Sequence, residues 1–242
     1  MRVAAKTMLL AAAMVASSAA SVARAETAHQ SVPNPAHCPP TPPLDSDGNE
    51  RKAPLKIPAA FAAMVKSDRT HLAITTLTGG TFCQDIHAVT KADTYALSAD
   101  RRFFSFDWYG YEEGGHVIVD RTGRGQAIDS GAVATLSPTG RRFAAVQFSE
   151  AGFGALEGFG VWQINPVGVR QLALLRDIPA LVDWRIDSWS GEDCVNLSGI
   201  PNERVADGNS DYRKFARDRY IARPAGGTWR LTRASRLGCP KE

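Results

Sequence analysis

The stretch Leu97-Ser-Ala-Asp-Arg-Arg-Phe-Phe104 is restated 39 residues later as Leu136-Ser-Pro-Thr-Gly-Arg-Arg-Phe143. Further along, Val117-Ile-Val-Asp120 corresponds to Trp162-Gln-Ile-Asn165 at an offset of 45, which predicts six extra residues inside the second copy. A repeat near this length is the sequence signature of arrays of similar structural units. The repeat therefore decides the fold class, although it carries little information about chemistry.

The residues within each copy predict turns and strands. Ser137-Pro-Thr-Gly140 and Asn165-Pro-Val-Gly168 have a small polar residue first, proline second and glycine fourth, as type I turns prefer. Asp120-Arg-Thr-Gly123 fits the same template without the proline. Residues 104–108 alternate between aromatic and polar side chains, the period of a strand. Each copy is therefore expected to form most of a four-stranded antiparallel blade.

These residues resemble a known family. The run 136–144 followed by 161–172 looks like a TolB-type or WD-like β-propeller repeat, and the resemblance spans residues 97–175. Thr139 replaces the usual Asp, and the first copy has Asp100-Arg101 in place of the glycine turn. Because such repeats occur in both binding modules and enzymes, the resemblance implies a fold and leaves the function open.

The ends of the β-rich region predict further units. Residues 71–84 and 219–232 each form two strand-like runs around a glycine turn, and residues 58–66 suggest a short helix. With the two clear copies, they give about four antiparallel units. We therefore expect an all-β, propeller-like fold, small or incomplete, with a twisted antiparallel β-sandwich as the alternative.

The N-terminal region predicts export. Residues 1–25 have a basic start, a short apolar run and the small-x-small pattern Ala23-Arg-Ala25 of a signal peptide. The alternative, a membrane anchor, is disfavoured because spanning a bilayer takes ~20 apolar residues. Residues 26–57 hold seven of the fourteen prolines and predict an extended arm before a single β-rich domain at 58–242. The expected location is periplasmic or secreted, with no transmembrane segment in the mature chain.

The four cysteines support the same compartment. An even count in an exported chain predicts two disulfides, and three pairings are possible. We favour Cys38–Cys83 with Cys194–Cys239, because each bond then pins one end of the chain onto nearby strands.

Charge and motifs exclude several function classes. The full chain carries a formal charge of +3, and removal of Arg2, Lys6 and Arg24 leaves 25 basic and 25 acidic residues. A nucleic-acid-binding role is therefore not supported. The histidines show no metal-ligand spacing, and nucleophile-elbow, phosphate-loop and dinucleotide motifs are missing from the sequence. We predict no metal and no cofactor. Asp85 and His87 would share a strand face, as half of a metal site, an oriented base or an ordinary strand pair.

Candidate site residues gather in glycine-rich loops that are aromatic and acidic. The first loop supplies polar and aromatic side chains, the matching loop of the second copy supplies another carboxylate, and residues 183–194 supply a third acidic segment. Such groups suit sugar stacking, a cationic peptide or a metal. Alternatively, the aromatic rings pack the hairpin ends while the acids stay solvated. The candidates are Trp108, Tyr109, Tyr111, Glu112, Glu113, His116, Glu150 and Asp187.

Two function classes remain open from the sequence. The first is a non-catalytic binding or scaffold module of the cell envelope that uses these loops to bind a protein or envelope component. It is favoured because the sequence presents binding groups without a recognisable catalytic constellation. The second is a periplasmic hydrolase that uses Glu112 or Glu113 with His116 or Asp187. An enzyme requires two titratable groups that converge on one concave pocket.

Overall fold

The computed structural model describes residues 32–41, 53–149, 152, 154–205, 211–234 and 238–239. The predicted signal peptide, part of the proline-rich arm and Glu150 lie outside these residues. The described chain is all-β, with short 3-10 turns η1 (Pro35–His37), η2 (Ala59–Phe61), η3 (Asn202–Arg204) and η4 (Tyr212–Lys214) as its helical elements.

Fifteen strands form four antiparallel sheets, which confirms the expected fold class and the expected four units. Sheet A contains β1 (Val65–Ser67), β2 (His71–Thr75) and β3 (Thr81–Asp85). Sheet B contains β4 (Lys91–Leu97), β5 (Phe103–Tyr109), β6 (Gly114–Asp120) and β7 (Gln126–Asp129). Sheet C contains β8 (Thr135–Leu136), β9 (Arg142–Gln147), β10 (Gly158–Asn165) and β11 (Gly168–Leu175). Sheet D contains β12 (Leu181–Ser190), β13 (Cys194–Pro201), β14 (Asp218–Ala225) and β15 (Thr228–Arg233).

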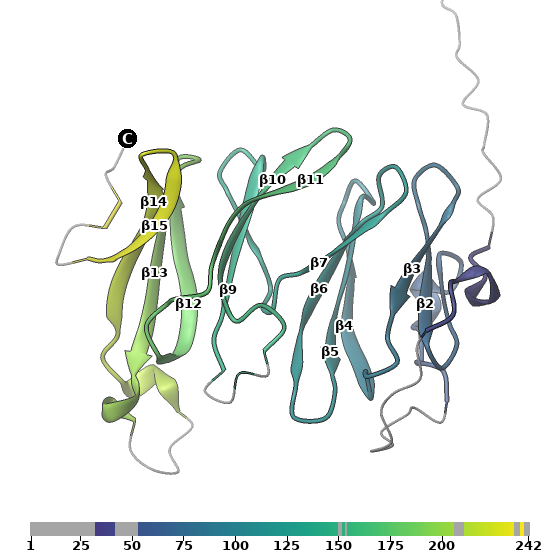
Figure 1. Ribbon diagram of the computed structural model, residues 1–242, viewed down its shortest axis with the longest axis horizontal. Coiled ribbons are helices and arrows are strands. Elements are labelled where there is room, and N and C mark those ends of the chain that lie inside the picture. The colour runs from purple at the N-terminus through teal and green to yellow at the C-terminus, as the bar shows by residue number, and fades with distance from the viewer. Residues whose placement is uncertain are drawn as a thin grey trace, which may run out of the picture.

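The sheets stand face to face in a row that follows the chain. Within every sheet the strands are hydrogen-bonded in sequence order, so each sheet is an antiparallel meander. Figure 1 shows sheets A and D at opposite ends of the row. The arrangement is therefore an open array of propeller-like blades, not a closed ring.

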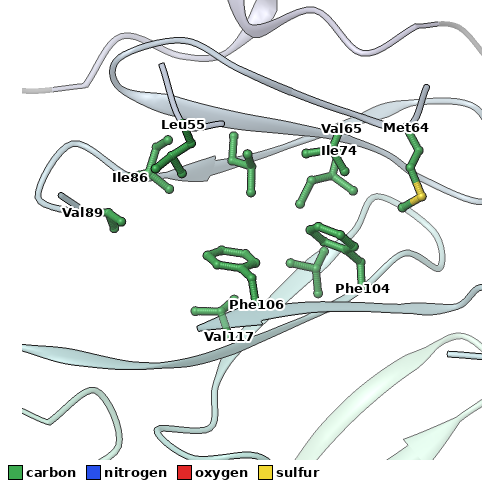
Figure 2. Packing of buried hydrophobic residues seen from close by; sticks show 11 residues of the cluster. Leu55, Met64, Val65, Ile74, Ile86, Val89, Phe104, Phe106 and Val117 are labelled. Atoms are coloured by element: carbon green, nitrogen blue, oxygen red, sulfur yellow. The ribbon is translucent and has the colours of Figure 1, made fainter. Parts of the chain in front are cut away.

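Three hydrophobic cores fill the gaps between successive sheets. The first joins sheets A and B, where Phe104 and Phe106 point toward Ile74 of β2 (Figure 2). The second joins sheets B and C, and the third joins sheets C and D. Because successive side chains of a strand point to opposite faces, sheets B and C each contribute to two cores.

The repeated turn has the same bonding in both copies. The Ser98 hydroxyl accepts from the Phe103 amide at 2.9 Å, and the Ser137 hydroxyl accepts from the Arg142 amide at 3.0 Å. The left-handed residues are Arg101, with φ 59°, and its counterpart Gly140, with φ 69°. These equivalences confirm that the two copies are matching units.

The second half of the repeat corrects the sequence alignment. Phe104 pairs with Val119, whereas Phe143 pairs with Trp162, so the copies differ there by 43 residues and not by 45. Four of the six extra residues therefore lie in the loop between β9 and β10. The other two extend the β10–β11 hairpin, whose tight turn closes the pair Asn165↔Gly168. The predicted turn at 120–123 is also displaced, because the Gly125 amide bonds to the Thr122 carbonyl.

The predicted helix at 58–66 is wrong beyond its first turn. Only the 3-10 turn η2 forms, and Val65 already lies in β1 opposite Ile74. A β-branched residue suits this buried strand position. The two predicted hairpins are confirmed as β2–β3 and β14–β15.

The two ends of the row are fastened by disulfides in the pairing predicted from the sequence. Cys38 bonds to Cys83 of β3, and Cys194 of β13 bonds to Cys239. Near the first bond, the Thr41 hydroxyl lies 2.9 Å from the buried His71 ring. Residues 33–41 therefore lie against the face of sheet A that points away from sheet B.

Arginine side chains tie neighbouring sheets together near the tight turns. The buried Arg121 donates to the carbonyl oxygens of Thr75 and Arg101, each at 2.6 Å. Arg102 pairs with the buried Asp120 at 2.7 Å and donates to the Asn165 carbonyl of sheet C. These bonds fix the relative positions of sheets A, B and C.

A search for membrane-spanning helices found none among the described residues.

Candidate functional site

The two aromatic, acidic loops lie at the same edge of the row and touch. The backbones of Gly114 and Gly154 form a parallel bridge, and the Gln147 amide donates to the Gly114 carbonyl at 3.1 Å. A Cβ added at Gly115 would lie 2.5 Å from the Cβ of Ala155, so glycine permits this close approach. We call this edge, opposite the tight turns, the loop edge.

The tip of the first loop presents aromatic groups to solvent. The exposed fractions are 69% for Tyr111 and 44% for Tyr109. The Lys91 ammonium lies 5.0 Å from the Tyr109 ring centroid, a cation–π contact. Exposed Glu112 has a left-handed backbone with φ 58°, and the Gly110 amide bonds to the Glu113 carbonyl at 2.8 Å. These tyrosines are therefore available to a partner rather than packed into the hairpin.

The candidates of the first loop divide between the two faces of sheet B. Trp108 packs with the core toward sheet A. His116 is 5% exposed and faces sheet C, where its Nδ1 lies 2.6 Å from Asp107 of the opposite strand. Trp108 and His116 consequently belong to different cavities.

An acidic pocket opens at the loop edge between sheets A and B. The cavity has a volume of about 170 Å³. Its carboxylates come from three segments: Asp85 ends β3, Glu113 precedes β6, and Asp129 ends β7. Gln84 and His87 also line the pocket, and its floor is formed by apolar side chains and one indole: Ile86, Ala88, Val89, Phe106, Trp108 and Val117. The acidic pocket therefore has a charged rim over an apolar floor.

The Asp85–His87 pair differs from the expected strand pair. Strand β3 ends at Asp85, whose carboxylate accepts from the His87 amide at 2.9 Å and lies 2.5 Å from His87 Nδ1. The pair is a local turn that places both side chains in the acidic pocket. Among the residues that the structure describes, the pair is not part of a group of three or more potential metal ligands.

Asp129 is the distinctive carboxylate of this pocket. Asp129 is exposed at the surface, but the protein atoms packed around its carboxylate partly desolvate the charged form, and this desolvation raises its pKa. Within the described ranges, no cationic side chain forms an ion pair with Asp129 or Glu113. A positive group brought by a ligand would compensate both carboxylates.

Asp187 lies far along the row from this pocket, in sheet D. It accepts from the Ser198 hydroxyl at 2.9 Å, and that hydroxyl in turn accepts from Arg217. These residues line a separate groove of about 690 Å³ on sheet D. The structure thus does not bring Asp187 together with Glu112, Glu113 or His116.

Two residues important to these cavities were missed from the sequence. Asp129 pairs with Val117 across β6 and β7 and so reaches the pocket that Glu113 lines, whereas Asp85 joins them only because sheet A stacks on sheet B. Asp107 carried a usable signal: with a four-residue loop at 110–113, the hairpin register places it opposite His116.

Comparisons with known proteins assign no family. No protein-family model matches the chain, and a search of curated proteins found no match. The resemblance of residues 97–175 to TolB-type or WD-like repeats stays a prediction, and the function must be argued from the cavities themselves.

Proposed function

We propose that this protein is an exported, non-catalytic binding module that takes a lysine side chain of a partner protein into the acidic pocket. The observation that carries the proposal is the convergence of Asp85, Glu113 and Asp129 on one small cavity, where two of the three carboxylates lack a cationic partner within the described chain.

The shape of the acidic pocket favours a side chain over a free metabolite. Small-molecule pockets usually measure ~300–1,000 Å³, and this cavity is about 170 Å³. Lysine has an apolar four-carbon stem and an ammonium group with three donors. The stem matches the floor formed by Phe106 and Val117, while the ammonium matches the carboxylate rim.

The surroundings of the pocket suit a protein partner. Tyr109 and Tyr111 stand exposed on the same loop as Glu113, and tyrosine is enriched where proteins contact each other. Rigid strands carry this loop, an arrangement common at binding sites. The partner would therefore insert a lysine while its neighbouring residues lie on the tyrosines.

Export is the second part of the proposal. Disulfides persist mainly in oxidising compartments, and both ends of this array depend on one. Together with the predicted signal peptide, they support a periplasmic or secreted location. N-terminal sequencing of the exported protein tests this part: a mature chain beginning at Glu26 is expected, and retention of residues 1–25 would contradict it.

The binding proposal is tested with matched small probes. Nα-acetyl-lysine methylamide should shift the Trp108 indole N–H resonance saturably in an NMR titration. The norleucine analogue has the same stem length without the ammonium and should bind at least about tenfold more weakly, since hydrogen bonds to charged groups contribute ~1.5–3 kcal/mol.

Variants locate the site. The double change Glu113→Gln and Asp129→Asn should abolish the lysine response and keep the fold. Glu203→Gln is the matched control, because Glu203 is an exposed acid in η3 of the distant sheet D region. Equal binding of the two probes, or full binding by the double variant, would refute the proposal.

A further inference from the structure

A second cavity lies on the other face of sheet B. This apolar pocket has a volume of about 280 Å³ and is separate from the acidic pocket. Phe103 and Ile118 line it from sheet B, and Phe143 and Ile164 line it from sheet C. The cavity thus occupies a gap in the core between the two repeated units.

The mouth of the apolar pocket is unusually apolar for a surface. Val133 is 67% exposed and Leu136 is 59% exposed, and both line the cavity. Single exposed apolar residues are common, but two that flank a cavity of apolar lining mark a place where an apolar molecule would gain by burial.

A histidine–carboxylate pair faces this pocket. His116 lines the cavity, and its Nδ1 lies 2.6 Å from the Asp107 carboxylate. A carboxylate only accepts hydrogen bonds, so Nδ1 carries the proton and Nε2 is the ring nitrogen left for the cavity. In the neutral ring Nε2 is an acceptor, which calls for a donor on the ligand.

The charges around the His116–Asp107 pair determine which head group a ligand of this pocket can carry. Asp107 stands beside His116, whereas Asp93, opposite Asp107 across β4 and β5, is ion-paired with Lys91 at 2.5 Å. The Asp107 carboxylate beside the ring disfavours an anionic ligand. Ser105, on the same face of β5 as Asp107, lines the cavity as well and adds a hydroxyl that can donate or accept.

We infer that the apolar pocket binds a small apolar molecule with a single hydroxyl head group, an alcohol or a phenol, whose O–H donates to His116 Nε2. Asp107 is then a positioning residue, because it fixes the tautomer that makes Nε2 an acceptor. This site is distinct from the acidic pocket and does not depend on the function proposed for it.

Three probes that share the 4-propylphenyl group test the inference by calorimetry. They are 4-propylphenol, 4-propylanisole and 4-propylbenzoate. The phenol should bind saturably, and the ether, which lacks the donor, should bind about tenfold more weakly. Equal binding of phenol and ether would overturn the role of His116. Tighter binding of the benzoate would overturn the assigned head group, and failure of all three to bind would overturn the site.

Three variants separate binding from folding. Leu136→Glu places a charge at the exposed mouth and should remove phenol binding, whereas Val167→Glu, at an 87% exposed hairpin tip, should leave it unchanged. His116→Phe should make the phenol and the ether bind alike. Unaltered phenol binding by Leu136→Glu would contradict the proposed location, and a retained preference for phenol in His116→Phe would contradict the proposed acceptor.

Discussion

The two faces of sheet B differ sharply in chemistry although the same strands build both. Toward sheet A, β6 and β7 present Val117 and Asp129 to the acidic pocket. Toward sheet C, the alternate residues His116 and Ile118 reach the apolar pocket. Since side chains alternate along a strand, residues adjacent in the sequence serve different cavities.

The side chains of the glycine-rich loop divide between these two faces of sheet B. The loop's aromatic and acidic residues look like one site when read along the chain. In the fold, Trp108 and Glu113 serve the gap between sheets A and B, whereas His116 serves the gap between sheets B and C. The array therefore forms two small cavities where the sequence suggested one group of site residues.

The largest loss of stability is expected from substitutions at the equivalent core positions of the two copies. Phe104→Ala and Phe143→Ala should each destabilise the fold by ~3–5 kcal/mol. Phe104 is fully buried against other aromatic rings, whereas Phe143 already borders the apolar pocket, so Phe104→Ala should cost more. Urea unfolding with the disulfides intact measures both, and a loss below ~1 kcal/mol at either site would contradict the packing.

The next effect concerns the tie between sheets A and B. Burial, and to a lesser degree the neighbouring Arg101, lowers the pKa of Arg121, which binds two carbonyl oxygens. Arg121→Met leaves both carbonyls without that donor and should cost about 2–4 kcal/mol. Exposed Arg124, in the same turn, supplies the control: Arg124→Met should stay within ~0.5 kcal/mol. Similar thermal stability of the two variants would show that the tie is unimportant.

A smaller effect on stability depends on pH and is expected only on the face of sheet B that lines the acidic pocket. Because desolvation raises the folded-state pKa of Asp129, its ionisation opposes folding. The stability that the protonated Asp129 carboxyl contributes is fully present below its unfolded-state pKa. This stability is lost as pH rises through its folded-state pKa. Asp129→Asn should therefore raise the melting temperature at pH 7 and lose this advantage at pH 3. An equal rise in melting temperature at both pH values would contradict a desolvated Asp129 carboxylate.

The smallest effect on stability is expected at the loop tip. The double change Tyr111→Ala and Glu112→Ala alters exposed side chains and should shift stability by no more than ~0.5 kcal/mol. Capture of a lysine-bearing partner should nevertheless be lost, because Tyr111 would no longer cover the peptide beside the inserted lysine. A large drop in melting temperature would instead show that the loop is packed core.

Much of the fold was predictable because local rules determined it. The repeated Ser98 and Ser137 turns and the alternation along the strands predicted the units, and one of the three cysteine pairings fastens each end of the row to a nearby strand. The site was less predictable. The pair Asp107–His116 follows from hairpin register, but the meeting of Asp85 of sheet A with Glu113 and Asp129 of sheet B depends on how closely the two sheets stack, which no local pattern encodes.

The indole N–H resonances of Trp108 and Trp162 test whether the opposite faces of sheet B hold two independent sites. Trp108 lines the acidic pocket, and Trp162 stacks on Phe143, which lines the apolar pocket, at 5.1 Å. With resonances assigned from Trp108→Phe and Trp162→Phe variants, Nα-acetyl-lysine methylamide should shift only Trp108, and 4-propylphenol should shift only Trp162. If each probe shifted both resonances with one common affinity, the two faces would form a single site and the account would be wrong.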